Sequence, residues 1–270
     1  MSKVAFVTMD MESFFDSGCM KRHHIAPDEE FDCASEVERF INYLDENNVK
    51  ATIFVAVSFL SRCKDILLKA IKNGHEIALH CLEHKDVRTM SVEQFEVEII
   101  EAKRTIKKEL GVEPVGFRFP CFKYTNEHLE VIKRNGFIYD SSATTKELRN
   151  KITIDKGFYE FSPNIYKFLL FFRINLSGGG YLRLMPRWAY SHKLNKCIKN
   201  GYYQLYLHPF EIYEGKFPKY KKLNIFERMY ISRGRKQYLS LISHLIDRLK
   251  GEGYEFFTMK EYISRENNHE

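Results

Sequence analysis

Two histidines four residues apart, His80 and His84, are the residues of this chain best suited to chemistry. They follow an apolar stretch, 74–79, that is typical of a short buried strand. Neutral imidazoles bind a metal ion through nitrogen at about 2 Å, and two of them with one carboxylate leave a position open for water. Either histidine alone would more often be a hydrogen-bonded or surface residue, but the pair at this spacing predicts a hydrolytic metal site.

Other reactive side chains also lie at the carboxyl ends of predicted strands. They are Asp10 and Glu12 after 3–10, Arg118 within 115–120, and His208 after 202–207. In a parallel barrel these ends share one face, and that face carries the active site. Each residue also has an ordinary interpretation: Asp10 as a turn or cap residue, Arg118 as a structural ion-pair partner, and His208 as part of a turn. Their shared placement favours a common site.

Strands and helices alternate along the chain, which predicts a mainly parallel sheet with crossover helices. The expected strands are 3–10, 51–57, 75–80, 115–120, 137–142, 202–207 and 254–258, and the expected helices are 35–47, 62–73, 91–110, 125–135, 192–200 and 232–250. Ser35 is the predicted N-cap of the first helix, in a capping box with Glu38, and Ser91 caps the third. No linker or repeat divides the chain, so one domain over residues 1–270 is expected.

The stretch 143–191 shows no clear periodicity. It contains Gly178-Gly179-Gly180, which predicts a loop where the backbone turns sharply or approaches another group closely.

The composition is that of a soluble globular protein, with 44% hydrophobic and 29% charged residues among 270. No stretch resembles a signal peptide, and no apolar run is long enough to span a bilayer. The six cysteines form no CxxC pair, so we expect reduced thiols in a cytoplasmic protein.

The net charge of +6 is concentrated in residues 216–236. This basic segment contains Lys216, Lys219, Lys221, Lys222, Arg228, Arg233, Arg235 and Lys236. Against them stands Glu227 alone, so the segment carries +7 and the remainder about −1. A solvated surface is the ordinary interpretation. The sharper hypothesis is an anionic partner, such as a phosphate-bearing substrate or a membrane surface. Nucleic acid is a weaker option, because no binding module accompanies the segment.

The motifs together resemble the polysaccharide deacetylases, the NodB-homology group that includes carbohydrate esterase family 4. The similar stretches are 8–12, 51–55, 74–84, 116–120 and 206–211, and the resemblance runs from about Val4 to Tyr262. Residues 177–183 resemble a stretch found in members tied to surface or extracellular polysaccharide synthesis. The resemblance implies an α/β fold, a single distorted (β/α) barrel with fewer than eight strands.

The resemblance also implies roles for individual residues. Asp10 matches the catalytic base, Arg118 the arginine that orients it, and His208 the general acid. The backbone N–H of Cys121 falls where the family places an oxyanion donor. We further expect Tyr181 and Arg183 to bind substrate.

A divalent metal ion is the implied cofactor, with zinc favoured over cobalt, nickel, iron or manganese. Glu12, His80 and His84 match its ligands. The chain has Asp10-Met11-Glu12 where most members have adjacent acidic residues, so Asp16 is the alternative third ligand. Asp140 is the expected tether of His208.

The implied function is a metal-dependent hydrolase that removes an N-acetyl group from an amino sugar in a polysaccharide or glycan precursor. The basic segment suits an anionic or lipid-linked precursor, and a location in the cytoplasm or at the inner membrane surface. One alternative is hydrolysis of a cyclic amide or ureide on the same fold, with or without metal. Another is a non-catalytic glycan-binding barrel.

Overall fold

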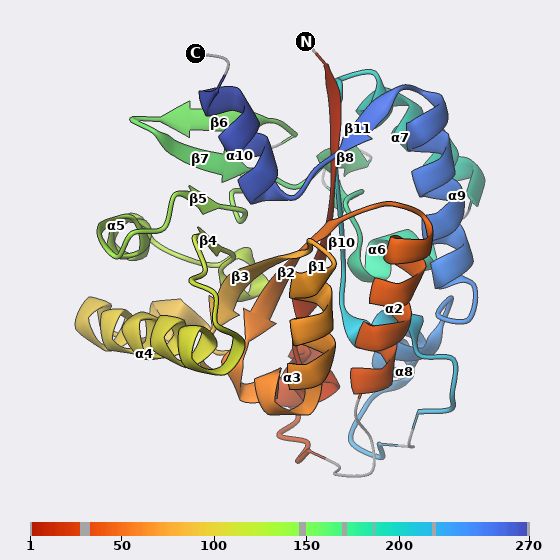
Figure 1. The fold of residues 1–270 in the computed structure, drawn as a ribbon. Helices are drawn as coiled ribbons and strands as arrows, with labels where there is room; N and C mark the ends of the chain where they lie inside the picture. The colour runs from red at the N-terminus through yellow and green to blue at the C-terminus, as the bar shows by residue number, and fades with distance from the viewer. Residues whose placement is uncertain are drawn as a thin grey trace.

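A curved, mainly parallel sheet forms the centre of the molecule (Figure 1). The computed structural model describes residues 2–27, 33–145, 150–168, 172–185, 187–217 and 220–268. The strands follow the order β10-β1-β2-β3-β4-β5-β7-β6, and β11 also pairs with β1. Every neighbouring pair from β10 to β7 is parallel, and β6 runs antiparallel at the edge. The predicted distorted (β/α) barrel is confirmed, but the sheet has nine strands in the described residues instead of fewer than eight, because the hairpin of β6 and β7 extends its edge.

The strands from β4 to β7 are shorter than β1, β2, β3 and β10. The bounds of the strands in the sheet are β1 Lys3–Met11, β2 Ala51–Ala56, β3 Glu76–Cys81, β4 Gly116–Phe117, β5 Tyr139–Asp140, β6 Ile152–Asp155, β7 Phe158–Phe161, β10 Tyr202–Leu207 and β11 Tyr254–Phe256.

Helices cover the outer face of the sheet (Figure 1). They are α2 Ala34–Glu46, α3 Val57–Lys72, α4 Val92–Leu110, α5 Asn126–Arg134, α7 Arg187–Ile198 and α9 Tyr238–Gly251. Helix α10, Met259–Asn267, lies near the amino ends of the strands, where Met259 and Ile263 join the inner cluster of buried residues and the Tyr262 ring packs edge-on against Phe6. The interior is therefore closed at that end.

Alternation along the strands decides which side chains enter the barrel. In β1, Val7 and Met9 join the large core beneath the helices, whereas Phe6 belongs to the inner cluster. Because successive strand residues point to opposite faces, Thr8 and Asp10 share the inner face with Phe6. The same rule places His80 of β3 inward, beside Ala78.

Several predicted boundaries are wrong. Helix α2 has Cys33 at its N-cap, and the hydroxyl of Ser35 instead donates to Glu36 Oε2, so the capping box with Glu38 is absent. Ser91 does cap α4, with Gln94 completing the box. Strand β4 has only two residues, because Pro120 lacks a backbone N–H and begins a short 3₁₀ helix, Pro120–Phe122.

The predicted helix 232–250 corresponds to α9, which begins only at Tyr238, and a separate helix, α8 Ile225–Ser232, precedes it. They separate at Gly234, whose φ of +77° lies in the left-handed region. A Cβ there would approach the carbonyl oxygen of Arg183 to 2.5 Å. Close backbone approach therefore requires this break.

The stretch 143–191 is more regular than its sequence indicates. It holds the β6–β7 hairpin, a separate antiparallel pair formed by β8 Ile165–Phe168 and β9 Phe172–Asn175, and α6 Gly179–Leu184. The glycine triplet makes the predicted close approach, since a Cβ on Gly178 would lie 1.7 Å from the carbonyl oxygen of Tyr206.

Candidate active site

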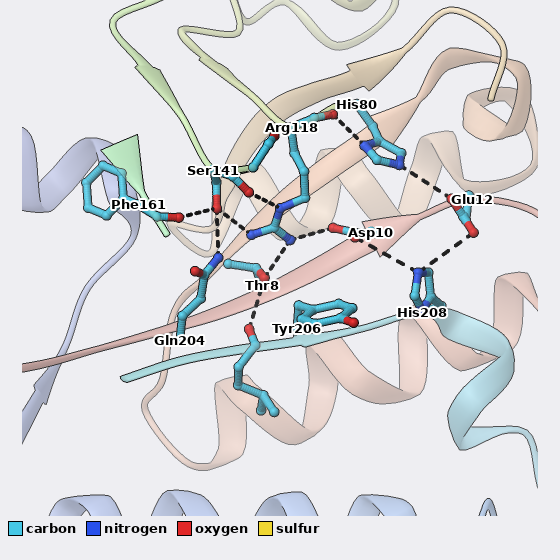
Figure 2. A network of polar contacts seen from close by, with 12 residues as sticks. Thr8, Asp10, Glu12, His80, Arg118, Ser141, Phe161, Gln204, Tyr206 and His208 are labelled. Atoms are coloured by element: carbon cyan, nitrogen blue, oxygen red, sulfur yellow. Dashed lines mark hydrogen bonds and ion pairs between the residues drawn. The ribbon is translucent and has the colours of Figure 1, made fainter. Parts of the chain in front are cut away.

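The candidate residues meet at the carboxyl ends of the strands (Figure 2). Asp10 lies in β1 and His80 in β3, while Arg118 follows β4 and His208 follows β10. Glu12 comes directly after β1. All five lie close enough to form one network of polar contacts, as the shared strand-end placement predicts.

Arg118 is fully buried and holds Asp10 from inside the barrel. Its Nη1 donates to Asp10 Oδ1 at 2.5 Å and to Thr8 Oγ1 at 2.9 Å. Its Nε and Nη2 donate to the carbonyl and the hydroxyl of Ser141. The guanidinium also lies 4.0 Å from the centroid of the Phe54 ring. Because all these partners fix the planar guanidinium of Arg118, it holds the Asp10 carboxylate in one orientation.

Glu12, His80 and His84 form a buried cluster suited to a metal ion. One ligand atom from each lies within 4.8 Å of the others. Glu12 Oε2 is 2.8 Å from His84 Nε2 and 3.4 Å from His80 Nε2, yet it accepts no well-directed hydrogen bond. A buried carboxylate oxygen without such a bond, facing two imidazoles, is the donor set of a divalent-metal site. The residues therefore fit the implied ion.

A further contact fixes the orientation of His80. Its Nδ1 lies 2.7 Å from the carbonyl oxygen of Arg118, the distance of an N–H donor to a carbonyl acceptor. This leaves Nε2 free of the proton and directed at Glu12, as in metal-ligating histidines. Arg118 thus orients two partners, Asp10 through its side chain and His80 through its backbone.

Charge within the cluster shifts the pKa values of its members. Burial favours the neutral form of Glu12, but His84 and His208 outweigh it and hold the Glu12 pKa well below its usual range. Burial lowers the pKa of His84, whereas the Glu12 carboxylate raises it by more. Glu12 therefore carries a negative charge, and a bound cation would take the place of the compensating proton.

Asp16 lies apart from this cluster. It ends the 3₁₀ helix Phe14–Asp16 and forms an ion pair with Lys21, 3.0 Å from Oδ1 to Nζ. It lines the same pocket as Glu12 but is not part of the three-residue group. The placement favours Glu12 over Asp16 as the third ligand.

His208 faces the cluster from β10. Its Nε2 lies 4.0 Å from Asp10 Oδ2 and 3.8 Å from Glu12 Oε1. Its Nδ1 lies 3.1 Å from Glu211 Oε2, an oxygen that also accepts the His208 backbone N–H. Burial lowers the pKa of His208, but Glu12, Glu211 and Asp10 together raise it to about 9. Protonated His208 is thus ready to act as a general acid.

The expected tether of His208, Asp140, does not reach it. Asp140 Oδ1 accepts a hydrogen bond from Ser142 Oγ at 2.7 Å, and the residue pairs in register with Glu160 across β5 and β7. Glu211 holds His208 instead. Glu211 was not predicted, although a Glu three residues after His208 has the spacing of a capping contact.

Arg183 is also misassigned as a substrate-binding residue. Its side chain is fully buried, and its Nε donates to Glu211 Oε1 at 2.9 Å. Its terminal nitrogens donate to the carbonyls of Arg233 and Tyr230. Arg183 therefore positions Glu211, which in turn positions His208.

A pocket of about 850 Å³ opens above these residues. Cys121 and the half-exposed Tyr181 line it, so both predicted residues lie where a substrate could meet them. Cys121 and Phe122 have φ of +55° and +57°, the left-handed region that such side chains seldom adopt. Such strain gathers at functional sites, where the surroundings fix an unusual backbone path.

Comparisons with known proteins show a family likeness over part of the chain. The sequence profile of polysaccharide deacetylases matches residues 15–139, and that of a domain of unknown function, DUF3473, matches 135–264. The first profile covers less than half of the chain, so the likeness to polysaccharide deacetylases is shown for residues 15–139. Both matched segments contribute to one sheet, since β4 of the first segment pairs with β5, and β5 pairs with β7 of the second.

Curated relatives share only part of their length with this chain. Chitin deacetylase 1 of Cryptococcus neoformans is 35% identical over 80 residues, which is 30% of this chain and 17% of that protein. The peptidoglycan deacetylase of Helicobacter pylori is 24% identical over 106 residues, 39% of this chain and 36% of that protein.

Solved structures agree in fold over nearly the whole chain. A protein from Mycobacterium smegmatis assigned to the polysaccharide deacetylases has a TM-score of 0.65 at 18% identity, covering 99% of this chain and 91% of its own. An allantoinase reaches 0.62 at 15% identity, with 98% and 90% covered. A family 4 pseudoenzyme from Bacillus anthracis reaches 0.55 at 11%, with 97% and 66% covered. At these identities the likeness concerns the fold alone.

Proposed function

We propose that this protein is a metal-dependent hydrolase that removes the acetyl group from an N-acetylated amino sugar. One observation carries the proposal. The base candidate Asp10, the acid candidate His208 and the Glu12-His80-His84 cluster lie in one pocket, with His208 Nε2 within 4.0 Å of a carboxylate oxygen of both Asp10 and Glu12.

A bound divalent ion would polarise the acetamide carbonyl and lower the pKa of a water molecule. The residues of the chain perform the proton transfers. Asp10, oriented by Arg118, accepts a proton from the attacking water through Oδ2, the oxygen that faces His208. The backbone N–H of Cys121 donates to the developing oxyanion. His208 gives its Nε2 proton to the departing sugar nitrogen, which allows the C–N bond to break. The products are acetate and a free amine.

Zinc is the proposed ion. Two imidazole nitrogens and one carboxylate are ligands that zinc accepts in catalytic sites, and this set leaves a position for water. Cobalt, nickel, iron and manganese share enough of this chemistry to substitute for it.

An anionic or lipid-linked glycan precursor is the proposed substrate. Exposed basic residues lie around the pocket: Arg22 and Arg233 line it, and Lys221 and Lys222 precede α8. Opposite charge at a pocket mouth raises the local concentration of an anionic substrate. Chitin, named in one relative, is an uncharged N-acetylated glycan, and its oligosaccharides serve as the comparison in the same assay.

Acetate release tests the proposal. Purified protein would be incubated with N-acetylated nucleotide sugars, lipid-linked sugars and chitooligosaccharides, with and without added Zn²⁺ or Co²⁺. Asp10→Asn, which keeps the shape but removes the base, should lower release by about 10²- to 10⁴-fold. Release that is equal in Asp10→Asn and the unchanged protein would overturn the assigned chemistry. Ring opening of a cyclic ureide without acetate release would favour the cyclic-amide alternative.

A further inference from the structure

Helix α8, Ile225–Ser232, presents its apolar side to solvent. The exposed fractions are 64% for Ile225, 78% for Phe226, 42% for Met229 and 41% for Tyr230. Large apolar side chains are exposed at ten positions of the described chain, and four of the ten lie on this one short helix. Such a concentration marks an interaction surface rather than scattered exposure.

The orientation of α8 reverses the usual pattern of a surface helix. At about 100° per residue, the four apolar side chains fall within about 140° of one another around the axis. Glu227 and Ile231 lie on the opposite side and are buried. Glu227 forms ion pairs with Arg22 and His23, at 3.0 and 2.9 Å. Polar contacts thus hold the helix with its apolar side outward, where a surface helix normally turns polar residues to water.

Positive charge surrounds this apolar surface. Lys221, Lys222, Arg228, Arg233 and Lys236 are exposed in or beside α8. Glu227, the sole acidic residue of 216–236, is buried and neutralised by its ion pairs. Of the three remaining basic residues of the segment, Lys216 is also exposed, Lys219 lies outside the described residues, and Arg235 is buried and stacks on the Phe217 ring at 3.9 Å. The exposed charge is therefore almost wholly positive.

We propose that α8 is a membrane-docking surface that inserts Ile225, Phe226, Met229 and Tyr230 into the interface of an anionic lipid bilayer. An exposed apolar stripe with Lys and Arg beside it is the composition of helices that lie in the bilayer interface. Basic side chains near the surface are attracted to anionic headgroups. The match in charge selects an anionic bilayer over a neutral one.

Docking there would bring the candidate active site to the lipid surface. Phe226, Met229 and Tyr230 also line the pocket that contains His208. Tyr181 of α6, half exposed, lines the pocket beside them. In Figure 1, α8 lies at the end of the molecule where β1 has its carboxyl end. A headgroup-linked sugar could then enter the pocket directly from the bilayer.

Vesicle sedimentation tests this surface without any assay of catalysis. The full chain would be mixed with vesicles of phosphatidylcholine alone, or with about 30% phosphatidylglycerol added to supply the anionic charge. We expect binding to the anionic vesicles only, and its decline as salt rises. Ile225→Ser with Phe226→Ser should weaken binding about tenfold or more, and Lys221→Glu with Lys222→Glu should do the same.

Matched variants on the distant helix α4 control for general changes in hydropathy and charge. Val97 and Ile100 are 67% and 52% exposed, and Lys107 and Lys108 are exposed lysines. Val97→Ser with Ile100→Ser, and Lys107→Glu with Lys108→Glu, should leave vesicle binding unchanged. Circular dichroism would check that every variant is folded. Equal losses in the α4 and α8 variants would overturn the proposal. So would a concentration-dependent dimer that Ile225→Ser with Phe226→Ser dissociates while vesicle binding is absent, because a second copy would then cover this surface.

Discussion

Glu211 is the residue whose role the structure changes most. It is buried, and it joins Arg183 in the interior to His208 at the pocket. Burial raises the pKa of Glu211, but the Arg183 guanidinium and His208 outweigh burial and lower it. The carboxylate therefore stays charged and supports a protonated His208. Arg183 therefore influences His208 through Glu211, although it does not line the pocket.

Replacing Glu211 tests that connection. Glu211→Gln keeps the size but removes the charge, so kcat for acetate release should fall by about 10- to 100-fold with little change in KM. Because Glu211 raises the His208 pKa, its loss should also move the alkaline limb of the pH–kcat profile to lower pH. The exposed neighbour Glu214 pairs with Arg39, and Glu214→Gln should leave both quantities unchanged. A normal profile in Glu211→Gln would show that His208 needs no tether.

The sequence identifies the reactive side chains more readily than the residues that hold them in position. Strand-end placement is enough to predict that Asp10, His80, Arg118 and His208 lie together. It cannot separate Asp140 from Glu211 as the tether, because both are carboxylates near the end of a strand. Only the direction of the side chains decides between them, and that direction depends on the paths of two segments far apart in the chain.

At the scale of elements, the β6–β7 hairpin has a turn whose residues favour it. Lys156 and Gly157 form its two-residue loop, with φ of +50° and +81°. A glycine in such a loop is typical of the hairpin turn that needs positive φ at both central residues. By contrast, β4 and β5 have two residues each, too few for any periodicity. Their place in the sheet depends on tertiary contacts alone.

Gly178 tests whether the glycine triplet is required by packing. Gly178→Ala would place a Cβ 1.7 Å from the carbonyl oxygen of Tyr206, so we expect a loss of about 3 kcal/mol or more in the free energy of unfolding. Tyr206 also packs edge-on against His208, which couples the shift to the site. Denaturant unfolding would measure the loss.

A second glycine serves as the control for that substitution. Gly251 ends α9, and a Cβ added there would meet no heavy atom within 4 Å, so Gly251→Ala should be neutral or slightly stabilising. Equal effects of the two alanines would mean that the Tyr206 contact does not constrain the chain.

At the scale of the whole molecule, the fold follows from the alternation of strands and helices, which the sequence shows clearly. The order of the strands does not, because β10 joins β1 from almost 200 residues away. Within the described residues, every helix is too short or too polar to cross a membrane. The cytoplasmic location stays a prediction, since nothing in the fold bears on it.

Global stability should depend on the carboxyl pair Asp140 and Glu160. Burial raises the pKa of Asp140 to about 6, and burial together with Asp140 raises the pKa of Glu160 well above its usual value. In the unfolded chain both titrate near 4. Between about pH 5 and 8 the folded state thus binds more protons than the unfolded state, and this pair's contribution to stability falls as pH rises.

Glu160→Gln removes one of the two charges and should flatten that dependence. The variant should gain stability relative to the unchanged protein as pH rises from about 5 to 8, on the order of 1.4 kcal/mol for each unit of raised pKa. Denaturant unfolding at both pH values measures the difference. Glu113→Gln, at a side chain 53% exposed, should give no such trend. A constant difference across this range would contradict the raised pKa of the pair.

The most direct test of the account is a metal titration of the stripped protein, followed by both bound metal and acetate release. We predict that release rises in proportion to bound Zn²⁺ or Co²⁺ and saturates near one ion per chain, as a single Glu12-His80-His84 site requires. His80→Ala with His84→Ala should abolish both the binding and the release. Full acetate release by the metal-free protein, or by this double variant, would contradict a metal-dependent reaction at this site.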